Sequence, residues 1–106
     1  MQDDASVEMS VADLAARRET GDVQVVDVRT DEEWTEERLE GSRHVEMNEL
    51  TTAAESIEKA TTVVFVCSGG NRSAMAAEAF RTSGYDAFSL AGGLTAWSEQ
   101  GQQLER

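Results

Sequence analysis

The chain contains no proline, one cysteine, one histidine and a single lysine, Lys59. One cysteine cannot form an internal disulfide, so the fold does not depend on an oxidising compartment. No apolar run approaches the length that crosses a membrane, and the opening stretch MQDDASVEMS carries acidic side chains where a secretory signal carries basic ones. We therefore expect a soluble protein of the cytoplasm with no membrane partner.

Basic residues are scarce as well. Lysine and arginine together number 9 against 21 aspartates and glutamates, which gives a net charge of −12. This charge repels phosphate backbones, so we expect no nucleic-acid partner. The acidic residues are spread along the whole chain, which indicates a generally acidic, well-solvated surface more than a dedicated interface. Because salt screens such repulsion, the composition points towards a halophilic source.

The length of 106 residues predicts a single domain over residues 1–106, and no repeat or linker divides the chain. Three apolar stretches predict strands, and a short extended piece is expected near residues 43–47. The three strand stretches are residues 23–28, 61–66 and 85–90. Because helical patterns lie between them, the sequence predicts an α/β fold with a parallel sheet covered by helices on both faces.

Caps and apolar spacing predict where the first helices begin and end. Ser10 and Asp13 resemble a capping pair, and Gly21 is placed to end the helix that they begin. Asp31 is expected to cap a second, acidic helix, on which Trp34 faces inward as a core residue.

Three more helices are expected further along the chain. One should run through residues 48–60, and another should follow the strand at 61–66 with Met75, Ala79 and Phe80 packed inward. The last helix should bury Trp97.

The only cysteine lies in the stretch CSGGNRS, residues 67–73, between a strand and an alanine-rich helix. Ligands of open parallel sheets bind beyond the carboxyl ends of the strands, where this loop is expected. Its glycines let successive backbone N–H groups converge, the helix adds the positive end of its dipole, and Arg72 adds a cation. We expect these groups to keep Cys67 a reactive thiolate at neutral pH. The alternative, an inert buried cysteine, does not account for the glycines and the arginine that follow it.

Two further polar residues end the strand at residues 23–28, so they point to the same rim of the sheet. Asp27 and Arg29 are candidate supports of the cysteine loop. An equally good interpretation is structural: Asp27 accepts backbone N–H groups, and Arg29 pairs with Glu33. His44 has neither a triad nor a metal-ligand pattern near it, so we expect a structural or exposed histidine and no metal site.

Three motifs of the chain resemble the single-domain rhodaneses, a family of sulfurtransferases. CSGGNRS matches the C-x-x-G-x-R-S pattern of that family's active-site loop. DVRTDEEW, from Asp27 to Trp34, resembles its D-V-R-x-x-x-E-aromatic segment, and LAGGLTAW resembles its closing G-G-x-x-x-W signature at Gly92, Gly93 and Trp97. Order and spacing agree for all three, and the resemblance covers about residues 6–101.

The chain departs from the family pattern in one connection. Where the family has G-H-I, the sequence has Glu37, Arg38 and Leu39. Where the family has G-A-x-N-I-P, the sequence has GSRHVE, residues 41–46, with neither the asparagine nor the proline. The resemblance therefore does not extend to the conformation of this connection or to partner contacts there.

The resemblance implies a rhodanese-like fold, with a five-stranded, mostly parallel sheet flanked by helices on both faces, and a thiosulfate sulfurtransferase that needs no cofactor. Cys67 would take the outer sulfur of a donor and become a persulfide. Arg72 would position the donor, and Ser73 would cap the next helix with its hydroxyl near the thiolate. The implied loop residues are Ser68, Gly69, Gly70, Asn71, Arg72 and Ser73. Thiosulfate, a polysulfide or a protein persulfide can donate, and a thiol or a sulfur-carrier protein can accept.

Two other functions fit a reactive cysteine. Tyrosine phosphatases and arsenate reductases also pair a cysteine with an arginine on an anion-binding loop, but their loop has one residue more, or about 3.5 Å of chain. A redox sensor or a rhodanese-shaped interaction module is the non-enzymatic alternative, since an exposed thiolate is easily oxidised.

Overall fold

A computed structural model describes residues 6–106. The five strands form one sheet in the order β1-β5-β4-β2-β3, and every pair of neighbouring strands is parallel. The strands are β1 (Glu8–Met9), β2 (Val23–Asp27), β3 (Arg43–His44), β4 (Thr62–Val66) and β5 (Ala87–Leu90). The α/β prediction is confirmed, although the two-residue strand β1 was too short to be recognised in the sequence.

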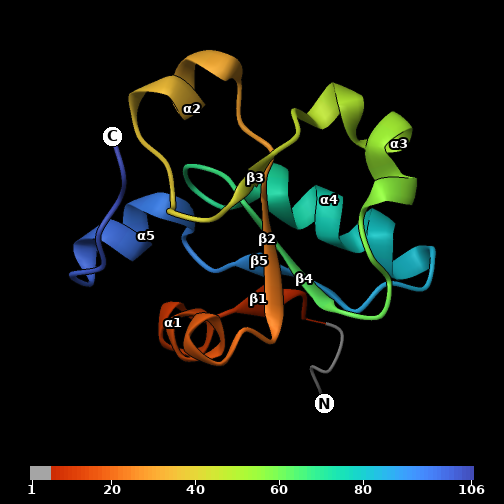
Figure 1. The fold of residues 1–106 in the computed structure, drawn as a ribbon, viewed down its shortest axis with the longest axis horizontal. Helices are drawn as coiled ribbons and strands as arrows, with labels where there is room; N and C mark the ends of the chain where they lie inside the picture. The colour runs from red at the N-terminus through yellow and green to blue at the C-terminus, as the bar shows by residue number, and fades with distance from the viewer. Residues whose placement is uncertain (1–5) are drawn as a thin grey trace.

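Helices cover both faces of the sheet, as expected (Figure 1). The α-helices are α1 (Val11–Thr20), α2 (Asp31–Glu36), α3 (Leu50–Ala53), α4 (Asn71–Thr82) and α5 (Gly93–Glu99), with 3-10 turns η1 (Met47–Glu49) and η2 (Ala54–Ser56) on either side of α3. Within residues 6–106, no helix is long and apolar enough to cross a bilayer.

Successive residues of each central strand supply two separate hydrophobic cores. One core joins the sheet to α3 and α4, and the other joins it to α1 and α5. Val26, Val63 and Phe65 face the first core, whereas Val25, Val64 and Val66 face the second. Side chains alternate between the faces of a strand, and a segment buried on both faces is apolar, which explains Val25 and Val26 of β2 and residues 63–66 of β4.

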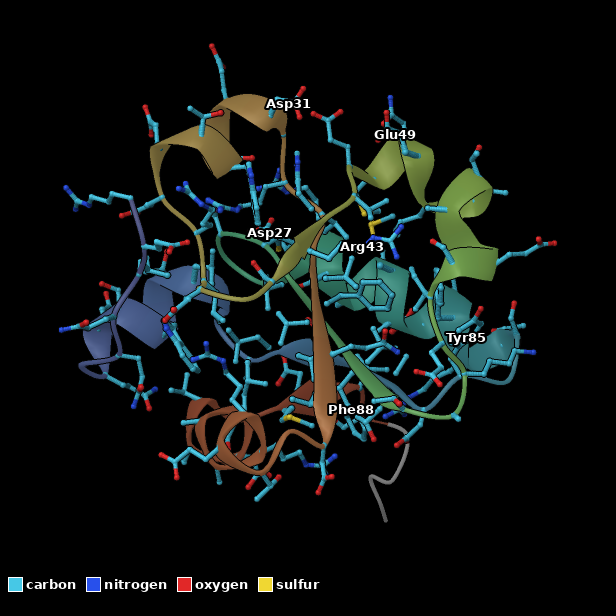
Figure 2. The ribbon with its side chains drawn as sticks, in the orientation of Figure 1. Asp27, Asp31, Arg43, Glu49, Tyr85 and Phe88 are labelled. Atoms are coloured by element: carbon cyan, nitrogen blue, oxygen red, sulfur yellow. The ribbon has the colours of Figure 1, made fainter. Side chains whose placement is uncertain are left out.

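The register of the two central strands fixes the position of the cysteine. Asp27, the last residue of β2, pairs with Val66, the last residue of β4, and Figure 2 labels Asp27 at this end of β2. Cys67 therefore follows the sheet at the same rim as Val28 and Arg29, as the sequence predicted.

The first helix begins and ends as predicted, but the second does not. Ser10 accepts a hydrogen bond from the N–H of Asp13, and Gly21 ends α1 with a φ of 79°. The N-cap of α2 is Thr30, so the assignment of Asp31 as the cap was wrong. Thr30 and Glu33 bind each other's backbone N–H in a capping box, which needs the glutamate three residues after the cap.

The helix expected over residues 48–60 is broken into three short turns. Ile57 adopts an extended conformation, which ends the helical turns. Its side chain lies in the core and is 2% exposed. The hydroxyl of Tyr85, labelled in Figure 2, donates to the carbonyl oxygen of Ala54 at 2.9 Å, and the N–H of Ile57 donates to the same oxygen at 3.0 Å. Tertiary packing thus overrides the local helical pattern.

The buried face of α4 was predicted only in part. Phe80 is buried as expected, but Met75 is 64% exposed and Ala79 is also exposed. The buried positions are Ser73, Ala76, Ala77 and Phe80, which follow the i, i+3, i+4, i+7 spacing of one helical face. Because α4 is rich in alanine, small residues lie on both of its faces, and the sequence alone does not show which face is buried.

Helix α5 holds the cysteine loop from the side of the second core. Leu94 N–H donates to the carbonyl of Cys67 at 2.8 Å, and Thr95 N–H donates to the carbonyl of Ser68 at 3.0 Å. Gly93 permits this approach: its φ is 65°, and a Cβ there would overlap both carbonyl oxygens. The G-G pair is therefore a packing requirement of the loop.

We predict that Gly93→Ala destabilises the fold by at least about 3 kcal/mol, because it combines left-handed backbone strain with a clash against fixed carbonyl groups. The matched control is Gly41→Ala, where φ is 82° but no atom lies within 4 Å of the added Cβ. It should cost only about 1–2 kcal/mol. Urea unfolding of both variants measures the difference, and equal losses would contradict the role assigned to Gly93.

Candidate active site

Cys67 follows β4 directly and is 1% exposed. The loop that begins with it runs through Ser68, Gly69 and Gly70 into the first turn of α4. Gly70 has a φ of 107°, a left-handed conformation that reverses the chain so that the following amides face back towards the sulfur.

Three donor groups of the loop contact the sulfur atom of Cys67. The N–H of Gly70 lies 3.1 Å from Sγ, and the N–H of Ser73 lies 3.4 Å from it. The hydroxyl oxygen of Ser73 is 3.3 Å from Sγ. Two of these groups are backbone amides that converge on the sulfur, as the glycines of the loop predicted, and the third is a hydroxyl.

Burial and hydrogen bonding act in opposite directions on Cys67. Burial raises the pKa of the thiol, but hydrogen bonds from the hydroxyl of Ser73 and from the backbone N–H groups of Ser73, Gly70 and Arg72 lower it by more. The net effect places the pKa of Cys67 below its ordinary value. A thiol stabilised as its anion in this way is a stronger nucleophile at neutral pH.

Ser73 does not cap α4, contrary to expectation. The N-cap is Gly70, and no side chain caps the helix. The Ser73 hydroxyl instead lies 2.7 Å from the hydroxyl of Ser89 on β5 and 3.2 Å from the carbonyl oxygen of Gly70. Both serines are buried, so this network fixes the Ser73 hydroxyl beside the sulfur.

Arg72 is held by a carboxylate from another helix. Its two terminal nitrogens lie 2.9 and 3.1 Å from the two oxygens of Glu33 on α2. This pairing raises the pKa of Arg72, burial opposes the rise, and the nearby Cys67 adds to it. The guanidinium is therefore bound by the carboxylate of Glu33 and also interacts with Cys67.

Glu33 was expected to pair with Arg29, and nothing in the sequence analysis assigned it to the cysteine loop. Besides Arg72, it accepts hydrogen bonds from the hydroxyl of Ser68 at 3.1 Å and from the N–H of Thr30 at 3.0 Å. Chiefly through the hydrogen bond from Arg72, the pKa of Glu33 falls to about 2, despite burial that opposes the shift. Its position in the D-V-R-x-x-x-E segment was the only signal in the sequence.

Asp27 and Arg29 form a buried ion pair with each other. The closest nitrogen–oxygen distance is 2.8 Å, and the two side chains are 0% and 5% exposed. Arg29 also donates to the carbonyl oxygen of Glu37 at 2.7 Å, so it joins the strand end to the residue that follows α2. The expected pair between Arg29 and Glu33 was wrong, because Arg72 occupies both oxygens of Glu33.

Trp34 differs from its predicted position, whereas His44 is structural, one of the two alternatives expected: its Nε2 lies 2.7 Å from the carbonyl oxygen of Arg29. Trp34 is only half-buried, and its ring stacks on the imidazole of His44 with centroids 4.9 Å apart. It therefore lies at the rim of the sheet instead of in a core. Trp97, in contrast, is 0% exposed as predicted. Asn71 and Gly69 are exposed at the tip of the loop.

The geometry defines a cradle for a negatively charged sulfur. No other described residue takes a hydrogen bond from the N–H groups of Ser68, Gly69 or Asn71. These three groups therefore have no acceptor among the described residues, and in the sequence they adjoin Cys67 and Gly70. A loop of this kind can stabilise a thiolate and a second small anionic atom bonded to it.

Comparison with known proteins identifies the family. The model of the rhodanese-like domain matches residues 10–100. Protein YtwF of Bacillus subtilis is 30% identical over 91 residues, which cover 85% of this chain and 88% of that protein. The thiosulfate sulfurtransferase GlpE of Pseudomonas aeruginosa is 35% identical over 81 residues, which cover 76% of this chain and 73% of that enzyme.

A solved structure agrees with the fold. The rhodanese-related protein of Thermoplasma volcanium matches with a TM-score of 0.85 and 27% identity, over 92% of this chain and 95% of that one. The family model covers most of the sequence, and the sheet and its helices superpose on a member of known structure. The chain therefore belongs to the rhodanese-like domain family.

Proposed function

We propose that this protein is a sulfurtransferase that carries a sulfane sulfur as a persulfide on Cys67. Family membership and a relative named as a thiosulfate sulfurtransferase support a role of the sulfurtransferase type. The observation that carries the finer proposal is the set of donors around the sulfur: two backbone N–H groups and the hydroxyl of Ser73 lie within 3.4 Å of Sγ.

The first half-reaction loads the cysteine. The thiolate of Cys67 attacks the outer sulfur of thiosulfate, and a new S–S bond forms. The bond between the two sulfurs of the donor breaks, and its electron pair leaves with sulfite. The product is a cysteine persulfide anion, and no proton is transferred. The lowered pKa of Cys67 supplies the thiolate that this step requires.

The second half-reaction empties the cysteine. A nucleophilic acceptor, such as cyanide or a thiol, attacks the outer sulfur and returns Cys67 to its thiolate. Between the two steps, the free N–H groups of Ser68, Gly69 and Asn71 stabilise the negative outer sulfur in the loop. The donor is thiosulfate, a polysulfide or a protein persulfide, and the acceptor is a small thiol or a sulfur-carrier protein.

Arg72 and Glu33 have different roles in this scheme. Arg72 attracts the anionic donor and balances the charge of the loaded sulfur. Glu33 is a positioning residue, since it holds the Arg72 guanidinium by two hydrogen bonds and the Ser68 hydroxyl by a third. Asp27 and Arg29 support α2, which carries Glu33, and make no hydrogen bond to the cysteine loop.

A phosphatase or arsenate reductase activity is less well supported. Such enzymes protonate a leaving group with a general acid. The carboxyl group that contacts the loop belongs to Glu33, whose pKa of about 2 keeps it ionised at neutral pH. Arg72, which would bind the oxyanion, is already bound by the same carboxylate.

A redox sensor or an interaction module is the remaining alternative. A sensor protects or traps its oxidised thiol with a second cysteine, and the chain has none. A module that only binds a partner has no need of the donors around Sγ. Both alternatives would leave thiosulfate untouched, so a loading experiment separates them from the proposal.

We predict that incubation with thiosulfate adds the mass of one sulfur atom to the protein, and that cyanide removes it with formation of thiocyanate. Intact-protein mass spectrometry measures the gain. Cys67→Ser should show none, and its folded state should be verified by circular dichroism. A protein that stays unmodified by thiosulfate and by polysulfide, yet hydrolyses a phosphomonoester, would contradict the proposal.

We predict that Arg72→Ala lowers kcat/KM for thiosulfate by about 10- to 100-fold. Without the guanidinium, the anionic donor is no longer positioned for attack by the sulfur of Cys67. The matched control is Arg106→Ala, an exposed arginine paired with Glu37, which should change kcat/KM by less than about twofold. Steady-state thiocyanate formation and thermal unfolding should both be measured. A variant that melts lower but retains its kcat/KM would contradict the role of Arg72.

We predict that Glu33→Gln lowers stability at pH 7 by about 1 kcal/mol, since the charge-assisted pair is partly exposed. The pKa of Glu33 is about 2 in the fold, below its ordinary value of 4.5. Ionised Glu33 therefore stabilises the fold above pH 4.5, and this contribution is lost as the pH falls to about 2.

Urea unfolding across this pH range measures the difference between the wild-type protein and Glu33→Gln. The gap should shrink as the solution becomes more acidic. Glu36→Gln, an exposed position on the same helix, serves as the control and should show no such pH dependence. A gap for Glu33→Gln that stays constant from pH 7 to pH 2 would refute the ion pair.

A further inference from the structure

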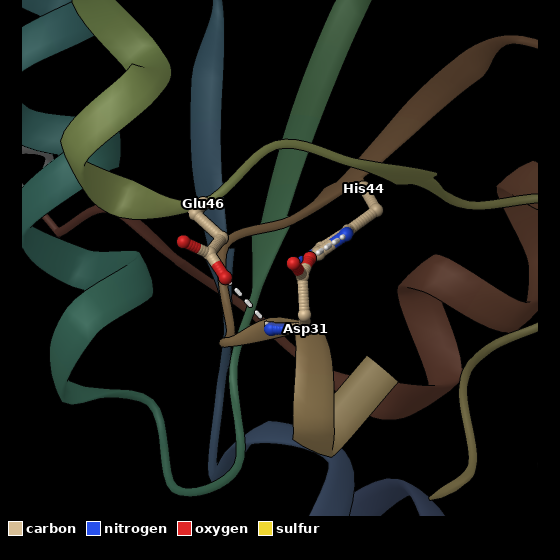
Figure 3. A group of neighbouring side chains, drawn as sticks. All are labelled: Asp31, His44 and Glu46. Carbon is tan, nitrogen blue, oxygen red and sulfur yellow. Dashed lines mark hydrogen bonds and ion pairs between the residues drawn. The ribbon is translucent and has the colours of Figure 1, made fainter. Parts of the chain in front are cut away.

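Three ligand-bearing side chains meet at the start of α2, away from the sulfur of Cys67. Asp31 is the first residue of α2, His44 ends β3, and Glu46 precedes η1. One ligand atom from each lies within 4.8 Å of the other two. Figure 3 shows the carboxylate of Asp31 facing the ring of His44, and the carboxylate of Glu46 bound to the backbone N–H of Asp31 beside them.

The hydrogen bond of His44 determines which ring nitrogen is available. Nε2 lies 2.7 Å from the carbonyl oxygen of Arg29, which can only accept, so Nε2 carries the hydrogen. Nδ1 of the neutral ring then presents a lone pair. Metal-binding histidines are oriented in this way, with the second nitrogen donating to a backbone carbonyl or a carboxylate.

The imidazole is also held in position by its surroundings. Trp34 stacks on it with an angle of 8° between the ring planes, and the side chain of His44 is 16% exposed. A ligand that is fixed before the ion arrives loses little conformational entropy on binding.

The lone pair of Nδ1 faces another acceptor. A carboxylate oxygen of Asp31 lies 3.5 Å from Nδ1. Two acceptors that face each other need a proton or a cation between them. Two ligands of a tetrahedral ion with bonds of about 2.1 Å are separated by about 3.4 Å, so this spacing suits a metal ion.

Glu46 completes the set. One of its oxygens accepts a hydrogen bond from the N–H of Asp31 at 2.7 Å, which anchors the side chain beside the first turn of α2. Figure 3 shows this oxygen on the side of Asp31 and His44, whereas the other oxygen of Glu46 points away from them. One imidazole nitrogen and one oxygen of each carboxylate lie within 4.8 Å of one another, and this ligand set suits divalent transition metals.

Two of the three ligands occur where the chain departs from the rhodanese pattern. His44 and Glu46 occupy the places of the asparagine and the proline in G-A-x-N-I-P. No motif of the sequence predicts a metal site, because His44 lies 13 positions after Asp31 and the two come together only when β3 pairs with β2.

We propose that Asp31, His44 and Glu46 bind one divalent transition metal ion of the zinc type, with water at the remaining positions. The ion joins the start of α2 to the connection after β3. Because α2 carries Glu33, which holds Ser68 and Arg72, an ion at this site stiffens the support of the cysteine loop. The net charge of −12 raises the local concentration of cations.

His44 is the only histidine of the chain, so its imidazole signals in proton NMR report on this site alone. The titration uses Zn²⁺ with untagged, EDTA-treated Cys67→Ser protein, because a thiolate also binds zinc. We expect the His44 signals to move and to saturate at one equivalent of Zn²⁺, and the melting temperature to rise. This readout does not depend on sulfur transfer, so its result tests the metal site independently of the proposed function.

Variants of the ligands test the assignment by calorimetry in the same background. His44→Asn, Asp31→Asn and Glu46→Gln should each weaken Zn²⁺ binding by at least about tenfold. The matched control is Glu32→Gln, an exposed carboxylate next to Asp31, which should bind as before. Zn²⁺ that leaves the His44 signals unmoved, or that binds all four variants equally, would overturn the site and indicate weak binding to the acidic surface or a simple His44–Asp31 ion pair.

Discussion

The hydrogen bonds that converge on the sulfur of Cys67 are the interaction on which the rest of the site depends. Without them, burial at 1% exposure would keep the thiol neutral and inert. With them, the anion is favoured although the side chain is buried. The loop can present its amides only because Gly70 reverses the chain before α4 begins. A short segment of backbone therefore sets the chemistry, and the remainder of the fold keeps that segment in one conformation.

Two elements outside the loop, α2 and α5, hold it by hydrogen bonds. The first amides of α5 bind the carbonyls of Cys67 and Ser68, and Gly93 makes their approach possible. Glu33 of α2 binds Arg72 and the Ser68 hydroxyl at the mouth of the loop. The DVRTDEEW and LAGGLTAW motifs, which flank the cysteine motif in the sequence, thus hold the loop in place by these hydrogen bonds. This gives a physical reason for their presence beside the cysteine motif.

The sequence predicted features that short stretches determine by themselves. The apolar runs, the Ser10 cap and the glycine loop after Cys67 each follow from neighbouring residues, and each is present in the structure. The errors concern partners chosen by tertiary packing. Arg29 pairs with Asp27, because Glu33 is bound by Arg72 instead. Glu33 and Arg72 lie about 40 residues apart in the chain, so this pairing depends on the tertiary fold. Neither composition nor periodicity carries that information.

The acid–base behaviour of Cys67 tests the central claim most directly. As the only cysteine, it can be titrated in the unmodified protein by the absorbance of its thiolate, with the rate of alkylation as a second measure. The hydrogen bonds to Sγ predict a midpoint clearly below that of a free thiol, about 8.5, and rapid alkylation at neutral pH. A midpoint at or above the value of a free thiol, with slow alkylation at pH 7, would contradict the account.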